Sequence, residues 1–124
     1  IDNADIGSLR YLTNARVRGS AKQTEKVAST AQFLWEPGNT LNGYPVEVTN
    51  QVPSNGTKGT GTDLSTNIFG NFADLLIGMW GGLDLMVDPY TNSTSGTVRV
   101  VALQDIDEAV RHPESFAAMT DIIT

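Results

Sequence analysis

Alternating apolar and polar positions recur along this chain, and each such run predicts a β-strand. A short strand is expected over Leu9–Thr13, and a second where Val46 and Val48 alternate with Glu47. The longest run covers residues 97–111, where the even positions are mostly apolar and several odd positions are charged. This run predicts a long strand with one buried face and a centre covered on both sides.

Two short helices are predicted, one near each end of the chain. Thr13 or Asn14 is a suitable N-cap for a helix over residues 15–22, which Gly19 weakens. Near the C-terminus, Pro113 suits the first position of a helix, and the residues after it predict a short terminal helix.

Residues 69–90 form the most apolar part of the chain. Short strands are expected over residues 68–72 and 75–79 around a turn, and a third after a break at Gly81 and Gly82. The longest run without a charge, residues 75–83, is too short for the ~20 residues of a membrane-spanning helix. We therefore expect the apolar side chains to fill the core of a flat sheet, namely Leu75, Leu76, Ile77, Leu83, Leu85 and Val87.

Turn and loop signals separate these elements. Asn42-Gly43 predicts a tight turn before a strand that Pro45 opens. Residues 54–67 and 91–96 are rich in Gly, Ser, Thr and Asn, which predicts mobile loops. The fold class that follows is α+β: one compact unit with antiparallel or mixed sheets and two short flanking helices.

Composition and charge narrow the function. The chain has 124 residues, of which 40% are hydrophobic and 18% charged, and its net charge is −6. Such an acidic chain is a poor match for nucleic-acid binding, which depends on Lys and Arg. One basic patch could in principle bind phosphate groups. A helix side that faces solvent or a partner explains this patch more simply than phosphate binding does. Its members are Arg10, Arg16, Arg18, Lys22 and Lys26.

The absence of cysteine excludes a disulfide framework and a thiolate metal site. Residues 1–9 lack the apolar core of a signal peptide, and the missing initial methionine suggests a trimmed or processed fragment.

Motifs for catalysis, phosphate binding and metal binding are weak. The only histidine, His112, precedes a proline, and no nucleophile motif accompanies it. Lys58 precedes Gly59 instead of following it, so the glycine-rich segment is not a phosphate-binding loop. Neither Asp88 nor Asp105 begins a calcium loop, because the sixth and twelfth positions of each lack Gly and Glu. We therefore expect no catalytic residue, metal site or cofactor.

Two other function classes stay open at this point. Asp84, Asp105 or Asp107 could serve an acid–base enzyme if a cleft brought two of them together. We expect instead that the acids of residues 97–111 form ion pairs across strands, together with Arg99 and Arg111. The second class is a small β-rich ligand- or carbohydrate-binding module, for which Phe33 and Trp35 are the best aromatic cluster.

Several short motifs, in order, resemble the C-terminal portion of tailed-bacteriophage major capsid proteins. They are Leu41-Asn-Gly-Tyr-Pro-Val46 with Asn50-Gln-Val-Pro53, Ile68-Phe-Gly-Asn-Phe72, Trp80-Gly-Gly-Leu83 and Ala109-Val-Arg-His-Pro-Glu-Ser-Phe116. Each motif is weakly specific, but the ordered set spans most of the chain. From the sequence we expect none of the N-terminal arm, extended hairpin loop and long spine helix of that family among these 124 residues.

The resemblance implies the tailed-phage capsid fold and a structural role without catalysis. Residues 1–97 would be axial-domain-like, and residues 98–124 a strand and short helix returning to the peripheral domain. The implied partners are copies of the protein itself, as pentamers and hexamers in the full-length protein. A small-molecule substrate, a membrane and sequence-specific nucleic acid are not expected as partners. The protein would be made in the bacterial cytoplasm from a phage or prophage gene and would reside in the virion.

The candidate subunit contacts are large amphipathic or loop residues. Trp80 and Tyr90 suit a domain edge or a subunit contact, although core packing explains Trp80 equally well. The other candidates belong to the two predicted loops, and they are Lys58, Asp63 and Asn92.

Overall fold

The structure, a computed structural model, describes residues 9–124. The chain divides into two compact units: Ile1–Asp74 with His112–Thr124, and Leu75–Arg111. The sequence predicted one unit, and its boundary between residues 97 and 98 falls inside the second of these two. Residues 1–8, which entered the argument against a signal peptide, lie outside the described residues.

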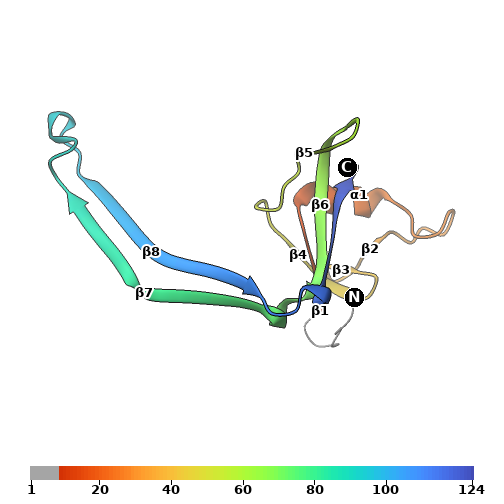
Figure 1. Ribbon diagram of the computed structural model, residues 1–124. Helices are drawn as coiled ribbons and strands as arrows, with labels where there is room; N and C mark the ends of the chain where they lie inside the picture. Colours follow the sequence, from red (N-terminus) through yellow and green to blue (C-terminus); the bar gives the residue numbers. More distant parts are fainter. Residues whose placement is uncertain (1–8) are drawn as a thin grey trace. The chain divides into compact units, whose positions relative to one another are not determined.

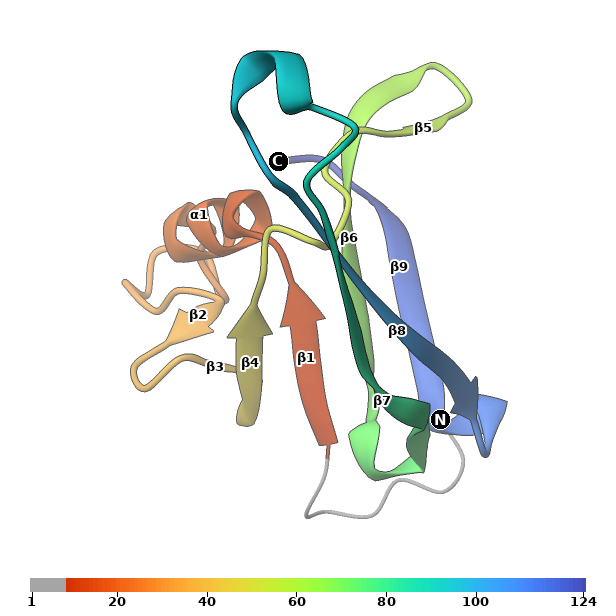
Figure 2. The ribbon, with the colours of Figure 1, turned by 90° about the vertical axis from the view of Figure 1, so that its left-hand side faces the viewer.

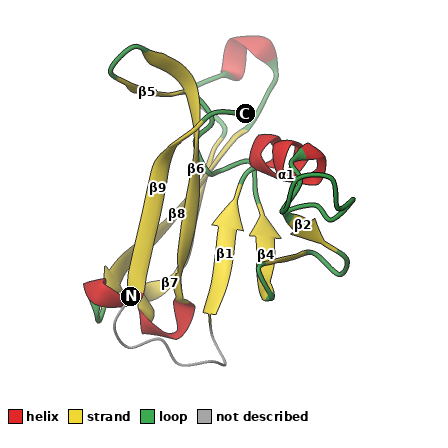
Figure 3. Cartoon of the chain, turned by 90° about the vertical axis from the view of Figure 1, so that its right-hand side faces the viewer, coloured by secondary structure: helices red, strands yellow, loops and turns green. Residues whose placement is uncertain are grey.

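The first unit is built on a mixed seven-stranded sheet (Figures 2 and 3). Its central strand β6 pairs antiparallel with β1, β5 and β9, while β1 and β4 run parallel. The mixed sheet and the strand over Leu9–Thr13 confirm the sequence expectation. The strands are β1 (Leu9–Thr13), β2 (Trp35–Glu36), β3 (Thr40–Leu41), β4 (Tyr44–Val48), β5 (Gly56–Lys58), β6 (Gly61–Asn71) and β9 (Phe116–Ile122).

Helix α1 (Ala15–Gln23) lies beyond the ends of β1 and β4 (Figure 3). The side chain of Asn14 caps it by accepting a 3.0 Å hydrogen bond from the Val17 N–H, and its Nδ2 donates to the carbonyl of Pro53. Asn14 is thus the N-cap, which satisfies one of the otherwise unpaired amide groups of the first turn. The helix contributes Ala21 to a small core with Trp35 and Val46.

The segment from residue 54 to residue 67 is not a loop, contrary to the prediction. It forms β5 and the first part of β6, joined by a turn in which Gly59 has φ +61. Leu64 and Ser65 are buried there, although the surrounding residues are small and polar. Pairing of β6 with its neighbouring strands holds these residues in strand conformation, although their own sequence preference indicates a loop.

The predicted C-terminal helix is also wrong. Pro113–Ser115 forms one 3₁₀ turn, η3, and the chain then continues as β9 beside β6. Phe116 lies opposite Gly70 in this pairing, and its ring meets that of Phe72 edge-on at 5.4 Å. Proline correctly marks the start of a helical turn, but strand pairing and aromatic packing end that turn after three residues.

The two turns predicted around β4 and after β6 are confirmed. Asn42 and Gly43 both have positive φ, +51° and +81°, before β4. The 3₁₀ helix η1 (Phe72–Asp74) follows β6. There the carboxylate of Asp74 accepts a 2.6 Å hydrogen bond from Ser115 Oγ, and both residues are buried. This bond joins the two places where the chain leaves and re-enters the first unit.

The second unit is a two-stranded antiparallel ribbon of β7 (Leu75–Asp88) and β8 (Arg99–Val110) (Figure 1). The 3₁₀ helix η2 (Ser93–Ser95) lies in its connecting loop. The long strand expected over residues 97–111 therefore exists, but its buried face does not: nearly all its residues are exposed within the described chain. The core predicted for the apolar residues of β7 is likewise wrong, because a lone pair of strands cannot enclose them.

Candidate assembly surfaces

The strand register sorts the side chains of the ribbon onto two faces, because residues directly opposite in an antiparallel pair point to the same side. One side, the apolar face, carries a single charged residue, Glu108. The other side, the mixed face, carries the remaining charges of the two strands. The apolar residues of the apolar face are Leu75, Ile77, Met79, Leu85, Val87, Val100, Ala102, Ile106 and Val110. The mixed face includes Leu76, Trp80, Asp84, Met86, Asp88, Arg99, Val101, Leu103, Asp105 and Asp107.

The apolar face is open to solvent along both strands. Ile77, Met79 and Leu85 are 63%, 64% and 64% exposed. Monomeric proteins rarely expose a continuous apolar patch of this kind, and an isolated two-stranded hairpin is at best marginally stable in water. The ribbon therefore has the composition of a surface that another polypeptide covers.

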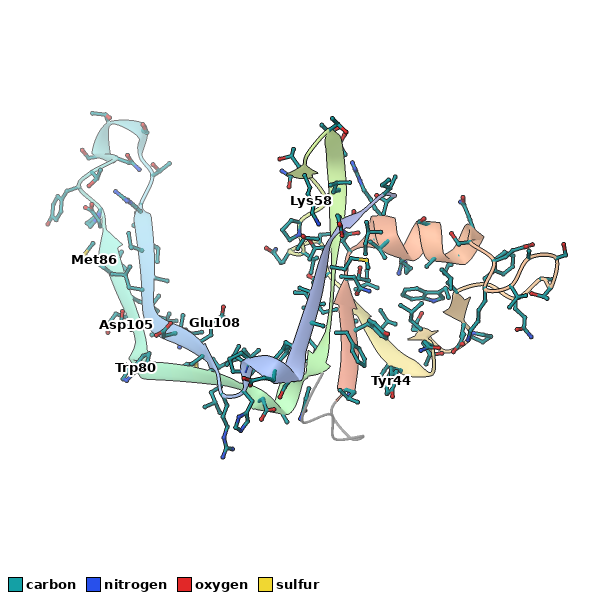
Figure 4. The ribbon with its side chains drawn as sticks, turned by 45° about the vertical axis from the view of Figure 1, so that its right-hand side comes forward. Tyr44, Lys58, Trp80, Met86, Asp105 and Glu108 are labelled. Atoms are coloured by element: carbon teal, nitrogen blue, oxygen red, sulfur yellow. The ribbon has the colours of Figure 1, made fainter. Side chains whose placement is uncertain are left out.

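A bulge interrupts the ribbon at Gly81 and Gly82, where the sequence predicted that one strand ends and another begins. The register shifts between Trp80 and Asp84, and Gly81 has φ +77, a conformation that glycine adopts without steric cost. The Trp80 ring lies over Gly78, where an added Cβ would be 3.1 Å from the indole. Trp80 is 60% exposed and opposite Asp105 (Figure 4). The alternative of core packing for Trp80 is thus wrong within this chain.

The tip of the ribbon presents two of the predicted contact residues. Tyr90 is 83% exposed, and Asn92 is exposed and makes no side-chain cap bond to η2. The Asp88 carboxylate shapes the turn by accepting hydrogen bonds from the Thr91 hydroxyl and from the amides of Tyr90 and Thr91. These bonds, the Thr91 hydroxyl first, lower the pKa of Asp88 below its usual value. The turn at the tip thereby holds the Asp88 carboxylate ionised.

The other two predicted contacts lie in the first unit, on the β5–β6 hairpin. Lys58 donates to Asp121 of β9 at 2.7 Å, and this hydrogen bond lowers the pKa of Asp121 (Figure 4 labels Lys58). Asp63 is exposed in β6 with φ +58. The five candidates therefore form two groups, one on the hairpin and one on the ribbon.

An open hollow of about 960 Å³ lies beside α1 in the first unit. Lys22, Lys26, Phe33 and Trp35 are among its lining residues. Trp35 is buried against the small core while Phe33 is partly exposed, so the two rings do not form the exposed aromatic pair that a sugar-binding face needs.

Glu36, at the edge of this hollow, is held ionised. Its carboxylate accepts hydrogen bonds from Lys26 Nζ at 2.9 Å and from the Gly43 N–H at 3.1 Å, and these bonds, Lys26 first, lower its pKa. A carboxyl whose pKa is lower when folded stabilises the fold above its unfolded pKa, and this contribution is lost as the pH falls through the folded pKa.

We therefore expect acid to destabilise the first unit partly through Glu36. In urea unfolding between pH 7 and pH 2, Glu36→Gln should be less stable than the wild type at neutral pH. The difference should shrink once the pH is below the ordinary glutamate pKa near 4.5. Glu114→Gln is the matched control, since Glu114 is exposed and forms no ion pair with any of residues 9–124. Parallel pH profiles for wild type and Glu36→Gln would contradict the assignment.

The arrangement offers little for catalysis or metal binding. Asp84, Asp105 and Asp107 all lie exposed on the mixed face, and no group of three metal-ligating side chains occurs in residues 9–124. Arg99 and Arg111 form no ion pair with any described residue, so the predicted cross-strand pairs are wrong. Within the same residues, no helix is long and apolar enough to cross a membrane.

Comparison with known proteins agrees with a surface built for assembly. The model of the phage capsid family matches residues 2–121. The chain belongs to the phage capsid family. The resemblance found in the sequence motifs is thereby confirmed, and nothing in the comparisons supports a carbohydrate-binding module.

This phage capsid protein is similar in sequence to a curated relative and in fold to a solved structure. The chain is 34% identical over 115 residues to the major capsid protein of Halomonas phage phiHAP-1, and this match covers 93% of the chain and 17% of that relative. It is also similar to the capsid of an empty GTA particle computed with C5 symmetry, with a TM-score of 0.66 and 17% identity over 94% of this chain and 39% of that one. The capsid fold and the α+β class are therefore confirmed, and the chain spans less than half the length of either relative.

Proposed function

We propose that this chain is the C-terminal portion of a major capsid subunit that assembles with copies of itself into an icosahedral phage head. Family membership supports the structural role, and the exposed apolar face of the ribbon carries the assembly part of the proposal. Burial of apolar surface stabilises protein association by roughly 25 cal/mol per Å² before the costs of binding, so a face of this kind drives association when it is covered.

The proposal gives the finer roles as follows. The full-length subunit forms pentamers and hexamers, is made in the bacterial cytoplasm from a phage or prophage gene, and resides in the virion. The axial-domain-like and peripheral-domain-like parts divide where the two compact units do, because a boundary at residue 97 would separate the paired strands β7 and β8. The protein has no catalytic role and needs no cofactor. The subunit contacts include the ribbon residues Trp80, Tyr90 and Asn92 and the hairpin residues Lys58 and Asp63.

Expression of the complete subunit in bacteria tests this proposal. We expect closed particles, detected as a fast-sedimenting species and seen by electron microscopy, because many modest interfaces add up around closed symmetry axes. A subunit that is folded by circular dichroism yet stays monomeric at high concentration would contradict it.

A further inference from the structure

Helix α1 carries positive charge that nothing in the described chain neutralises. Arg16, Arg18 and Lys22 are exposed and form no ion pair with any of residues 9–124, whereas the other cations of the same patch are paired with glutamates. Arg18 and Lys22 are four residues apart, so they lie on one side of the helix with about 6 Å between their Cβ atoms. Arg16 lies about 160° around the helix from Arg18.

The mixed face of the ribbon carries the opposite charge beside an aromatic ring. Asp105 and Asp107 are exposed on β8 and, two residues apart on a strand, lie about 7 Å from each other. Opposite them on β7 are Trp80 and Gly78, and the Trp80 ring covers the space that a side chain at Gly78 would take. We call Asp105, Trp80 and Asp107 the acidic seat.

The acidic seat has the chemistry that recognises an arginine. A guanidinium donates to carboxylates and stacks on an aromatic face, and tryptophan is the best ring for this contact. A second cation about 6 Å from the first matches the spacing of the two carboxylates. Arg18 and Lys22 therefore match the acidic seat in charge, in spacing and in the aromatic ring that an arginine can stack on.

We propose that Arg18 and Lys22 of one copy dock on the acidic seat of a neighbouring copy, an inference that rests on the proposed capsid function. Each copy carries both surfaces, so the contact runs head to tail and can close a ring. A phosphate-rich partner is the less suitable occupant for α1, because the chain as a whole has a net charge of −6.

Charge reversal in the complete subunit tests the contact. The helix-reversed variant is Arg18→Glu with Lys22→Glu, and the seat-reversed variant is Asp105→Lys with Asp107→Lys. We expect each alone to self-associate at least about tenfold more weakly at low salt, because two attractive pairs become repulsive. An equal mixture of the two variants should recover oligomers that contain both, since the reversed helix of one then meets the reversed seat of the other.

The outcomes separate the alternatives. If the two pairs met within one copy, the mixture would stay impaired while the variant with all four substitutions recovered, and the proposal would be overturned. If the cations of α1 bound packaged nucleic acid, the helix-reversed variant would form particles at normal yield with less nucleic acid, which also overturns it. A wild type that forms no oligomer at all would overturn the proposed function and this contact with it.

Two controls guard against misfolding and net-charge effects. Arg16→Glu and Glu108→Lys change the charge in the same directions, by half as much, on the far side of the helix and on the apolar face, and an equal mixture of these two should show no such recovery. The neutral variant Asp105→Asn with Asp107→Asn should assemble with less dependence on salt than the wild type, because screening has fewer charges to act on. Equal salt dependence would count against the contact even if the reversed variants failed to fold.

Discussion

Replacing Gly70 by alanine should lower the free energy of unfolding of the first unit by about 3 kcal/mol, the upper end of the usual overpacking cost. A Cβ at this position would lie 2.4 Å from Cδ1 of Phe116 and 2.7 Å from the carbonyl oxygen of Ser115. One of these atoms is part of a ring held edge-on by Phe72, and the other is backbone beside the buried hydrogen bond to Asp74. The ring can move only by losing its contact with Phe72, and the carbonyl only by a shift of the backbone where η3 leads into β9.

Gly19→Ala is the matched control for this prediction. Gly19 is inside α1 and has no atom within 4 Å of an added Cβ, so alanine there should stabilise the chain by about 0.5–1 kcal/mol. Urea unfolding followed by circular dichroism measures both changes. If Gly70→Ala raised the unfolding midpoint as Gly19→Ala is expected to do, the close approach of Phe116 to Gly70 would be wrong.

Replacing Ile106 by aspartate should abolish particle formation by the complete subunit while leaving the subunit folded. Ile106 lies opposite Met79 at the middle of the apolar face and is 61% exposed within the chain. Its substitution removes few contacts inside the chain, so the fold has little to lose. In an assembled shell that covers the apolar face, the same change buries an unpaired carboxylate, which costs several kcal/mol at each copy.

The matched control is Leu103→Asp, on the mixed face of the same strand. Leu103 is 62% exposed, nearly the same as Ile106, but it lies opposite Asp84. We expect Leu103→Asp to retain more assembly than Ile106→Asp, measured as the fraction of protein in the fast-sedimenting peak. Equal losses for the two variants would contradict the expected preference for the apolar face, and no loss for Ile106→Asp would contradict the role of that face in assembly.

The two faces of the ribbon explain why its sequence was informative in one respect and misleading in another. Alternation along β8 correctly predicts a long strand, because side chains of a strand point to alternate sides whatever lies beside them. The same alternation predicted a buried face, since apolar residues in a monomer usually lie inside. Within this chain β8 has only β7 as a neighbour, and two strands cannot bury their own surface.

The candidate contacts show a similar division. Asn92 was expected in a loop, and it lies with Tyr90 at the exposed ribbon tip, whereas Lys58 and Asp63 lie on paired strands instead of a mobile loop. The helical cations Arg18 and Lys22 were recognised as part of a basic patch, but the acidic seat was not. Its three residues come from two strands more than twenty positions apart, and local sequence does not predict the register that places Asp105 opposite Trp80.

The sequence by itself determined those secondary-structure elements that depend only on residues close together in the chain. The cap at Asn14, the helix after it, the turn at Asn42-Gly43 and the alternating strands all follow from backbone preferences and side-chain periodicity. The ordered motifs were also enough to assign the family, because they extend along most of the chain. By contrast, most of β6 and the strand after Pro113 exist because strands distant in sequence pair with them, and β5 forms as the hairpin partner of β6. Long-range pairing also places Phe116 against Gly70 and arranges the ribbon residues on two faces. Both arrangements depend on which strand pairs with which, and the conformational preferences of neighbouring residues carry no information about strand partners.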